Sequence, residues 1–212
     1  MSFQLVVMAQ MVRGAFGLSQ GSASSDCATI QGVRRDASPG LNGPKPLGPT
    51  TIDSMDFEEA KRILAALERE GVRYVLIGSM AMAAQGLIRA TRDIDFFVSP
   101  DPDNVERLRR ALKSVFDSDA NVDEITASDL AGDYPAIEYT PPHGLYSLDI
   151  LSRLGEAFVF ENIEWEELIV DGIRVRVATP RMLYRMKKDT VRPLDRIDAE
   201  AIRERFGLPE ND

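Results

Sequence analysis

The chain has 212 residues, with 44% hydrophobic and 28% charged side chains, which suits one soluble globular domain. Its formal net charge of -9 and pI of about 4.8 argue against a broadly basic nucleic-acid-binding face. One cysteine, Cys27, and one histidine, His143, exclude an intrachain disulfide, a cysteine-based zinc site and a His-rich metal centre. No apolar run approaches the roughly 20 residues that span a bilayer, so we expect a cytoplasmic chain without a membrane contact.

The composition changes along the chain. Residues 1–53 are rich in Gly, Ser, Pro and Gln, with no sustained hydrophobic period, and we expect this segment to be disordered. Periodic apolar patterns begin after it. We therefore expect the folded domain over residues 54–207, with C-terminal helices from about residue 179 and a tail at 208–212.

The first helices are marked by their ends. Asp56 and Glu59 resemble a capping box, and apolar residues recur at helical spacing from there until Gly71 ends the helix. An Ala/Met-rich stretch predicts a short helix over residues 80–85. After two prolines, Asp103 is expected to cap a helix that runs to about residue 116.

Two further helices are predicted near the C-terminus. Thr179 followed by Pro180 is typical of an N-cap with proline at the first helical position. Asp198 is expected to cap a last helix, which ends near Gly207.

Short apolar runs predict the strands. Asp171-Gly172 is the strongest hairpin signal in the chain, because both residues tolerate the positive φ of a tight turn. Helices and strands alternate without a repeat, so we expect an α/β (α+β) fold with a small mixed central sheet and flanking helices. The expected strands cover residues 73–77, 93–98, 136–139, 146–151, 167–170 and 173–177.

Asp93 and Asp95 open an apolar strand. Residues two apart on a strand point to the same face, so the two carboxylates are expected side by side. Neighbouring carboxylates repel each other, and a divalent cation removes that penalty. Oxygen ligands without His or Cys favour Mg²⁺ or Mn²⁺, whereas strand-edge acids facing water are the alternative. Two other Asp-x-Asp pairs lie in polar, turn-like settings, where solvated or capping roles are expected: Asp101 with Asp103, and Asp117 with Asp119.

Two features near the pair strengthen the prediction of a phosphate and metal site. Gly78-Ser79 follows a strand and precedes a helix, and such a turn lets the backbone approach a phosphate while Ser79 adds a hydroxyl donor. Asp149 is a lone charge in an apolar strand, which is unfavourable unless the charge is paired or metal-bound. A routine strand-to-helix turn and an edge-strand acid or ion-pair partner are the alternatives.

These residues carry a resemblance to a known family. The segment 77–95, with its Gly-Ser turn and Arg-x-Thr-x-Asp-hydrophobic-Asp strand, resembles the first motif of nucleotidyltransferases related to DNA polymerase beta, and more narrowly of AbiEii-type nucleotidyltransferases. Asp149 lies in a segment that resembles the second motif. Residues 181–198 resemble the C-terminal motifs, through Lys187, Arg192, Asp195 and Asp198.

The resemblance implies roles for individual residues. Asp93, Asp95 and Asp149 would bind the metal, and Asp149 would also help to activate the acceptor. Lys187 would face the phosphates or stabilise the leaving group; a solvated helix lysine is the alternative. The nucleotide would be held by Gly78, Ser79, Arg89 and Lys187, whereas Thr91 is expected to be structural and Arg192, Asp195 and Asp198 could equally be capping and ion-pair residues.

The family implies transfer of a nucleoside monophosphate from a nucleoside triphosphate to an acceptor hydroxyl, with Mg²⁺ or Mn²⁺ as cofactor. The acceptor is left open between tRNA, a protein and a small molecule. A cognate antitoxin or toxin protein is a possible partner, since AbiEii-type proteins occur in toxin–antitoxin pairs. The alternative is a non-catalytic nucleotide-binding or partner-binding protein of the same fold.

Overall fold

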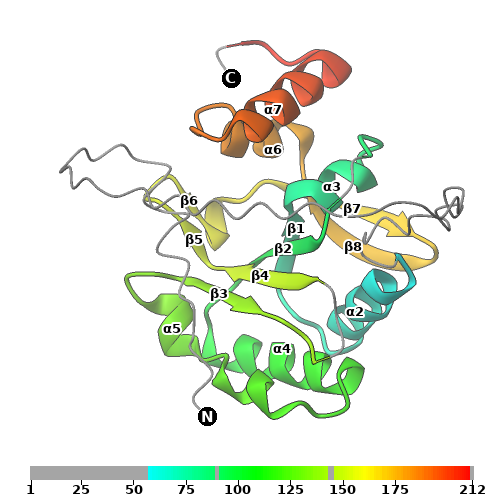
Figure 1. The fold of residues 1–212 in the computed structure, drawn as a ribbon, viewed down its shortest axis with the longest axis vertical. Helices are drawn as coiled ribbons and strands as arrows, with labels where there is room; N and C mark the ends of the chain where they lie inside the picture. Colours follow the sequence, from blue (N-terminus) through cyan, green and yellow to red (C-terminus); the bar gives the residue numbers. More distant parts are fainter. Residues whose placement is uncertain (1–56, 89–90, 143–145, 211–212) are drawn as a thin grey trace, which may run out of the picture. The chain divides into compact units, whose positions relative to one another are not determined.

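The computed structural model describes residues 57–88, 91–142 and 146–210. Within these residues, a mixed six-stranded sheet has the order β3-β4-β2-β1-β8-β7 and carries helices on its sides, which confirms the α/β class (Figure 1). Four features predicted above lie outside the described residues: the segment 1–53, Asp56 of the capping box, Arg89 and His143.

The strands of the sheet match the predicted runs to within one or two residues. They are β1 (Tyr74–Ile77), β2 (Asp93–Val98), β3 (Ala136–Tyr139), β4 (Ser147–Leu151), β7 (Trp165–Val170) and β8 (Ile173–Ala178). The helices are α2 (Phe57–Arg69), α3 (Gly78–Ala84), α4 (Pro102–Val115), α5 (Ala127–Ala131), α6 (Pro180–Lys187) and α7 (Pro193–Phe206).

The centre of the sheet brings distant strands together. β1 runs antiparallel to β2, and β2 runs parallel to β4, although about fifty residues separate them in the chain. β1 is also parallel to β8, which forms the predicted hairpin with β7. Asp171 and Gly172 have φ angles of 49° and 83°, as a two-residue hairpin loop with two positive φ angles requires.

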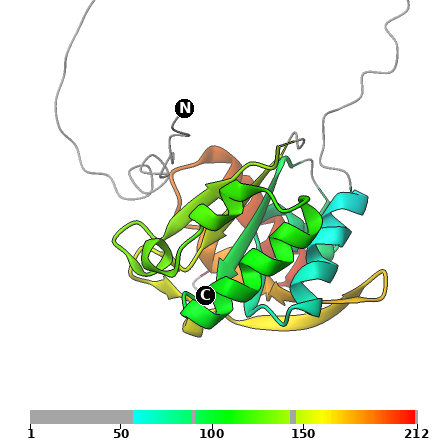
Figure 2. The same ribbon diagram turned by 90° about the horizontal axis from the view of Figure 1, so that it is seen from below.

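Helices cover the sheet on two sides. Figures 1 and 2 show α2 and α4 next to each other on one side, whereas α6 and α7 lie together on the other side, near α3. Most residues of β4 and the last three residues of β2 are buried, and the core is continuous. Its largest fully buried side chains include Phe96, Phe97, Ile63, Leu67, Leu108 and Ile150.

Two predicted helix caps are wrong. The N-cap of α4 is Asp101, whose carboxylate accepts from the backbone N–H groups of Asp103 and Asn104, so Asp103 lies inside the first turn. Here Pro102 sets the first helical position and places the cap one residue before it. Asp198 does not cap α7, which begins at Pro193; it lies inside the helix and is buried. The Thr179 cap of α6 and the end of α7 at Gly207 are confirmed.

The short helix after β1 also begins earlier than predicted. α3 starts at Gly78 rather than at residue 80, so Gly78 and Ser79 form its first turn. Gly78 has a φ of 62°, which lets the chain pass directly from strand into helix.

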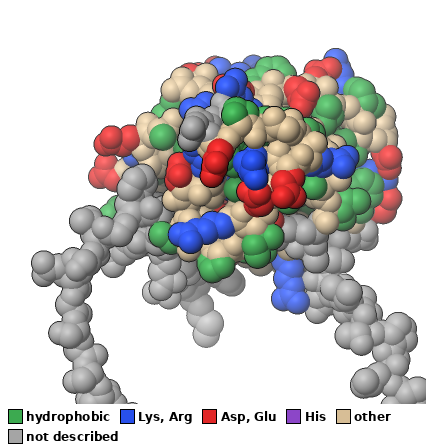
Figure 3. All heavy atoms as spheres, turned by 90° about the horizontal axis from the view of Figure 1, so that it is seen from above, with side chains coloured by type: hydrophobic (Ala, Val, Ile, Leu, Met, Phe, Trp, Pro, Cys, Tyr) green, Lys and Arg blue, Asp and Glu red, His purple; other side chains and the backbone are tan. Residues whose placement is uncertain are grey.

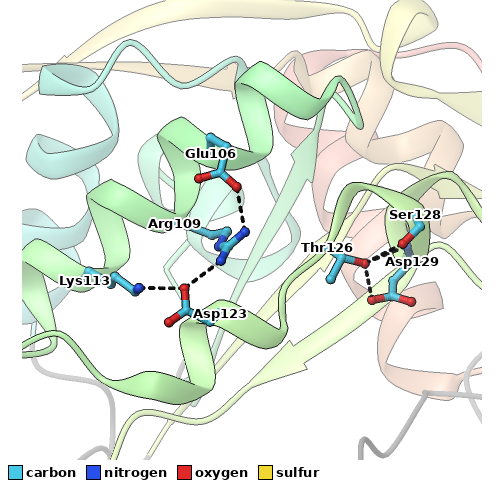
Figure 4. Close-up of polar contacts among 7 residues, drawn as sticks. All are labelled: Glu106, Arg109, Lys113, Asp123, Thr126, Ser128 and Asp129. Carbon is cyan, nitrogen blue, oxygen red and sulfur yellow. Dashed lines mark hydrogen bonds and ion pairs between the residues drawn. The ribbon is translucent and has the colours of Figure 1, made fainter.

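Several short elements were not predicted because their apolar periods are too short to detect. They are η1 (Ala120–Glu124), α5, β5 (Arg153–Leu154), β6 (Phe158–Val159) and η2 (Phe160–Asn162). Figure 4 shows polar contacts at two of them: Arg109 and Lys113 of α4 each donate to Asp123 of η1 over 2.6 Å, and the Thr126 hydroxyl contacts the side chains of Ser128 and Asp129. Thr126 also caps α5, because its hydroxyl accepts from the Asp129 backbone N–H. Within the described residues, no helix combines the length and apolarity needed to cross a membrane.

Candidate active site

The three predicted metal-binding carboxylates lie on two adjacent strands. Asp95 of β2 pairs in register with Asp149 of β4, and Asp93 pairs with Ser147. Because the strands are parallel neighbours and the residues are two apart, all three aspartates belong to the same face of the sheet. The Ser147 hydroxyl donates to Asp93 Oδ1 over 3.0 Å. The structure therefore brings together Asp93, Asp95 and Asp149.

The Gly-Ser turn lies directly against this face. Ile77, the last residue of β1, is the register partner of Asp95, so Gly78 follows beside the carboxylate. A Cβ atom added to Gly78 would lie 1.9 Å from Asp95 Oδ2. Only glycine fits this approach, and its backbone borders the carboxylate closely. Ser79 follows in the first turn of α3 and is 3% exposed.

Asp149 is an unusual carboxylate. It lies on an inner strand of the sheet, because β4 is flanked by β3 and β2, and the residue is 5% exposed. No group in the described residues donates a hydrogen bond to its buried Oδ1. The pKa of Asp149 is raised to about 7, chiefly by burial and also by the charges of Asp95, Asp93 and Glu138, whereas the charge of Arg192 lowers it.

Glu138 was not among the predicted site residues. It lies on β3, directly opposite Asp149 in the antiparallel β3–β4 pair, and its side chain is exposed. The row Asp95, Asp149, Glu138 thus crosses three neighbouring strands. The run at 136–139 was predicted as a strand, but its pairing with β4 was needed to place Glu138 at the site.

The C-terminal motif residues form a compact ion-pair cluster. Lys187 Nζ lies 2.7 Å from Asp195 Oδ1 and 2.9 Å from Asp198 Oδ2. Lys187 and Asp198 are buried, at 8% and 3% exposure. Arg192 Nη1 lies 4.0 Å from Asp195 Oδ2. The ion-pair role considered for Asp195 and Asp198 is confirmed, whereas a direct contact of Lys187 with phosphate stays a prediction.

Thr91 has contacts that fit the structural role expected for it. Its hydroxyl accepts from the backbone N–H of Asp93 over 3.3 Å and donates to the Asp93 carbonyl over 3.2 Å. These bonds brace the entry to β2 just before the carboxylate pair. The two other Asp-x-Asp pairs have local structural roles, since Asp101 and Asp119 accept backbone N–H groups as N-caps.

The donor set fits a divalent cation. Among the described residues, no group donates to the buried Asp149 Oδ1, and the neighbouring side chains of Asp93 and Asp95 offer hard oxygen ligands. As their side chains stand, no three His, Cys, Asp or Glu residues in the described segments converge closely enough to hold a metal ion. Bringing the three aspartates onto one ion therefore requires side-chain rotation on a fixed backbone.

A model of one protein family matches more than half of the chain. The model described as "Nucleotidyl transferase AbiEii toxin, Type IV TA system" matches residues 62–195. This range contains the Gly-Ser turn, all three aspartates, Lys187 and Asp195. The chain belongs to the AbiEii nucleotidyl transferase family. It is thus a nucleotidyltransferase, as the motifs around Gly78 and Asp93 predicted.

One solved structure is similar to this AbiEii protein in fold. The lincosamide antibiotic adenylyltransferase LnuA is 14% identical with a TM-score of 0.50, over 74% of this chain and 99% of that chain. A protein described as a nucleotidyltransferase from Thermotoga maritima is 17% identical with a TM-score of 0.44, over 72% and 92% of the two chains. ANT(2")-Ia, in complex with adenylyl-2"-tobramycin, is 16% identical with a TM-score of 0.41, over 70% and 87%. No curated protein sequence matches the chain.

Proposed function

We propose that this AbiEii protein transfers a nucleoside monophosphate from a nucleoside triphosphate to an acceptor hydroxyl, with Mg²⁺ or Mn²⁺ held by Asp93, Asp95 and Asp149. The observation that carries the proposal is the in-register pair of Asp95 and Asp149, with the Gly78 backbone against Asp95. The Gly78 backbone thus borders a pair of carboxylates whose mutual repulsion a bound cation would relieve, which supports a metal-bound phosphate at this turn.

The residues divide the reaction between them. Gly78 and Ser79 bind the triphosphate through backbone and hydroxyl donors, on the β1 side of the carboxylates. Asp149 Oδ1, which accepts no hydrogen bond from the described residues, takes the proton of the acceptor hydroxyl. The hydroxyl oxygen of the acceptor forms a bond to the α-phosphorus, and the bond between the α-phosphorus and pyrophosphate breaks. Bound divalent cations would lower the pKa of the hydroxyl and neutralise the leaving pyrophosphate. The burial of Asp149 keeps bulk water away from this proton transfer.

Label transfer tests the proposal. The protein is incubated with Mg²⁺ and each α-³²P-labelled nucleoside triphosphate, together with cell extract that is afterwards separated into RNA, protein and small-molecule fractions. We expect label in one fraction, which identifies the acceptor class. Asp95→Asn and Asp149→Asn should abolish the transfer. Asp101→Asn is the matched control, because asparagine also serves as an N-cap and Asp101 belongs to an Asp-x-Asp pair outside the site.

Two results would contradict the proposal. One is label transfer by Asp95→Asn at the wild-type rate. The other is the absence of transfer in every fraction, together with a melting temperature that Mg²⁺ and nucleoside triphosphates do not raise, since a ligand that binds only the folded state must stabilise it. Nucleotide-dependent stabilisation without transfer would instead favour a non-catalytic nucleotide-binding protein.

A further inference from the structure

Asp93 is the exposed carboxylate among the three proposed metal ligands, whereas Asp95 is half-buried and Asp149 is buried. Burial restricts the side chain of Asp149, and the Gly78 backbone lies against that of Asp95. An exposed aspartate side chain samples several rotamers unless a contact selects one of them. The orientation of the Asp93 carboxylate therefore depends on its polar neighbours.

Ser147 contacts this carboxylate directly. It is the register partner of Asp93 across the parallel β2–β4 pair, and its hydroxyl donates to Asp93 Oδ1 over 3.0 Å. The serine is 9% exposed, and its backbone N–H donates to the Arg92 carbonyl over 3.2 Å. A largely buried hydroxyl on a strand that is paired at its main chain thus reaches the side chain of a proposed metal ligand.

A hydroxyl suits this place better than a cationic donor. It donates to the carboxylate without adding a positive charge, so the carboxylate keeps its attraction for a divalent cation. A lysine or arginine in its place would pair with Asp93 and repel the metal. The bond engages Oδ1, and the second oxygen, Oδ2, lies outside it. Hydrogen-bonded neighbours of this kind orient metal-binding side chains and strengthen metal binding.

Thr91 restrains Asp93 at a different point. Its hydroxyl bonds to the backbone N–H and the carbonyl of Asp93, whereas Ser147 bonds to the carboxylate. The main chain and the side chain of Asp93 are thus held by different residues. Removing the Ser147 hydroxyl therefore changes the restraint on the carboxylate and leaves the Thr91 bonds in place.

We propose that Ser147 is a positioning residue, whose hydroxyl orients the Asp93 carboxylate for binding of Mg²⁺ or Mn²⁺. The inference rests on the proposed function, because Asp93 is a ligand of the metal proposed there. A serine hydroxyl turns about a single side-chain bond, so it can follow the carboxylate through the rotation that brings the three aspartates together. Without the hydroxyl, the metal must order the Asp93 side chain itself, which weakens binding.

Titration with Mn²⁺ alone tests the role without nucleotide or acceptor, because electron paramagnetic resonance measures the Mn²⁺ that remains unbound. Ser147→Ala should weaken Mn²⁺ binding roughly ten- to hundredfold. Ser147→Thr keeps a hydroxyl and should bind close to the wild-type level. Ser152→Ala is the matched control: Ser152 is also buried and directly follows β4, but its hydroxyl donates to the Leu130 carbonyl, so Mn²⁺ binding should be unchanged.

The titration needs a measure of weak Mn²⁺ binding outside the site, because the chain carries a formal net charge of -9. Figure 3 views the molecule from the side of the C-terminal helices and shows acidic side chains interspersed with basic ones, so exposed acids on that face contribute to this background. The double variant Asp95→Asn/Asp149→Asn measures the background, because two of the three proposed ligands lose their charge. Its residual binding is subtracted from every titration.

A double-mutant cycle separates positioning from direct ligation. In the Asp93→Ala background no carboxylate is left to orient, so Ser147→Ala should cause no further loss of Mn²⁺ affinity. A second loss as large as the first would show that the hydroxyl binds Mn²⁺ itself, and the positioning role would be wrong. Should Ser147→Ala fail to fold, Ser147→Cys takes its place, since a thiol of similar size is only a weak donor.

The outcomes also distinguish this inference from the proposed function. Wild-type protein that binds no Mn²⁺ above the background contradicts both. Wild-type binding that Ser147→Ala leaves intact, or that Ser152→Ala weakens equally, overturns the role of Ser147 alone, as does a Ser147→Thr variant that binds as weakly as Ser147→Ala. In those three cases the carboxylate site still stands.

Discussion

Asp149 is the residue at which burial and charge conflict most directly. Its carboxylate lies between two strands that each place another acid beside it, Asp95 on one side and Glu138 on the other. Such a position stabilises the fold only when the carboxyl is protonated or a cation is bound. An ionised Asp149 without a cation therefore destabilises the fold, and strongly shifted carboxyl pKa values of this kind are common at functional sites.

Asp149→Asn should stabilise the metal-free protein at high pH. The pKa of Asp149 is raised to about 7 in the folded state, so the folded state holds a proton that the unfolded chain releases near pH 4. Stability therefore falls as pH rises from about 4 to about 7, and asparagine escapes this loss. We expect the variant to exceed the wild type by roughly 2–4 kcal/mol at pH 8, measured by urea denaturation in EDTA.

The difference between the two proteins should shrink toward zero near pH 4, where both carry a neutral side chain. Asp101→Asn controls for the substitution itself, because Asp101 is half exposed and caps a helix. A stability gain that is the same at pH 4 and pH 8 would contradict the electrostatic explanation.

At the scale of elements, the junction between β1 and α3 brings the backbone against the Asp95 carboxylate. The chain turns from strand to helix at Gly78, which combines a positive φ with contact to the Asp95 side chain. The sequence indicated the turn through its Gly-Ser pair. The reason for glycine lies in a strand that follows fifteen residues later, so local pattern did not show it.

Gly78→Ala should destabilise the protein more than Gly172→Ala. Both glycines have positive φ angles, 62° and 83°, so alanine introduces comparable backbone strain of about 1 kcal/mol at each. At Gly172 nothing lies within 4 Å of the added Cβ, whereas at Gly78 it meets Asp95 Oδ2 at 1.9 Å. We expect a further loss of about 1–3 kcal/mol at Gly78, from urea denaturation.

The two variants should also differ in their response to metal. Displacement of the Asp95 carboxylate by the new methyl group should reduce the rise in melting temperature that Mg²⁺ and nucleoside triphosphate produce. Gly172→Ala should retain that rise. Equal losses of unfolding free energy in both variants would contradict the prediction, because they would show that the Asp95 side chain moves away from the new methyl group without destabilising the fold.

At the scale of the whole molecule, the C-terminal helices belong to the same core as the sheet. Met182 and Leu183 of α6 and Ile202 of α7 are each 1% exposed or less. The opposite surface of α7 is exposed, with Ile197 at 65%. The cluster around Lys187 therefore sits in a unit that is packed against the sheet, rather than on an independent appendage.

Ile202→Ala should lower the stability of the entire fold. A fully buried isoleucine replaced by alanine leaves a cavity, and losses of about 2–5 kcal/mol are usual. Trp165, the single tryptophan, lies on β7, so its fluorescence reports the sheet rather than the mutated helix. We expect its unfolding midpoint to fall together with the far-ultraviolet circular dichroism midpoint.

Ile197→Ala, on the exposed side of the same helix, should leave both midpoints within about 0.5 kcal/mol of the wild type. Separate transitions for fluorescence and circular dichroism would show that α6 and α7 unfold independently of the sheet.

The sequence by itself determined the strands, the Gly-Ser turn, the three aspartates and the family. The strands and the turn depend on local periodicity and short spacings, which act over a few residues, whereas the family follows from the resemblance of its motifs. Only the tertiary structure decided that Asp149 pairs with Asp95, that Glu138 joins the row, that Asp198 is a buried ion-pair partner rather than a cap, and that Lys187 is enclosed while Arg192 is exposed. Each of these depends on strand pairing or helix packing between segments far apart in the chain, where burial and charge act through space rather than along the sequence.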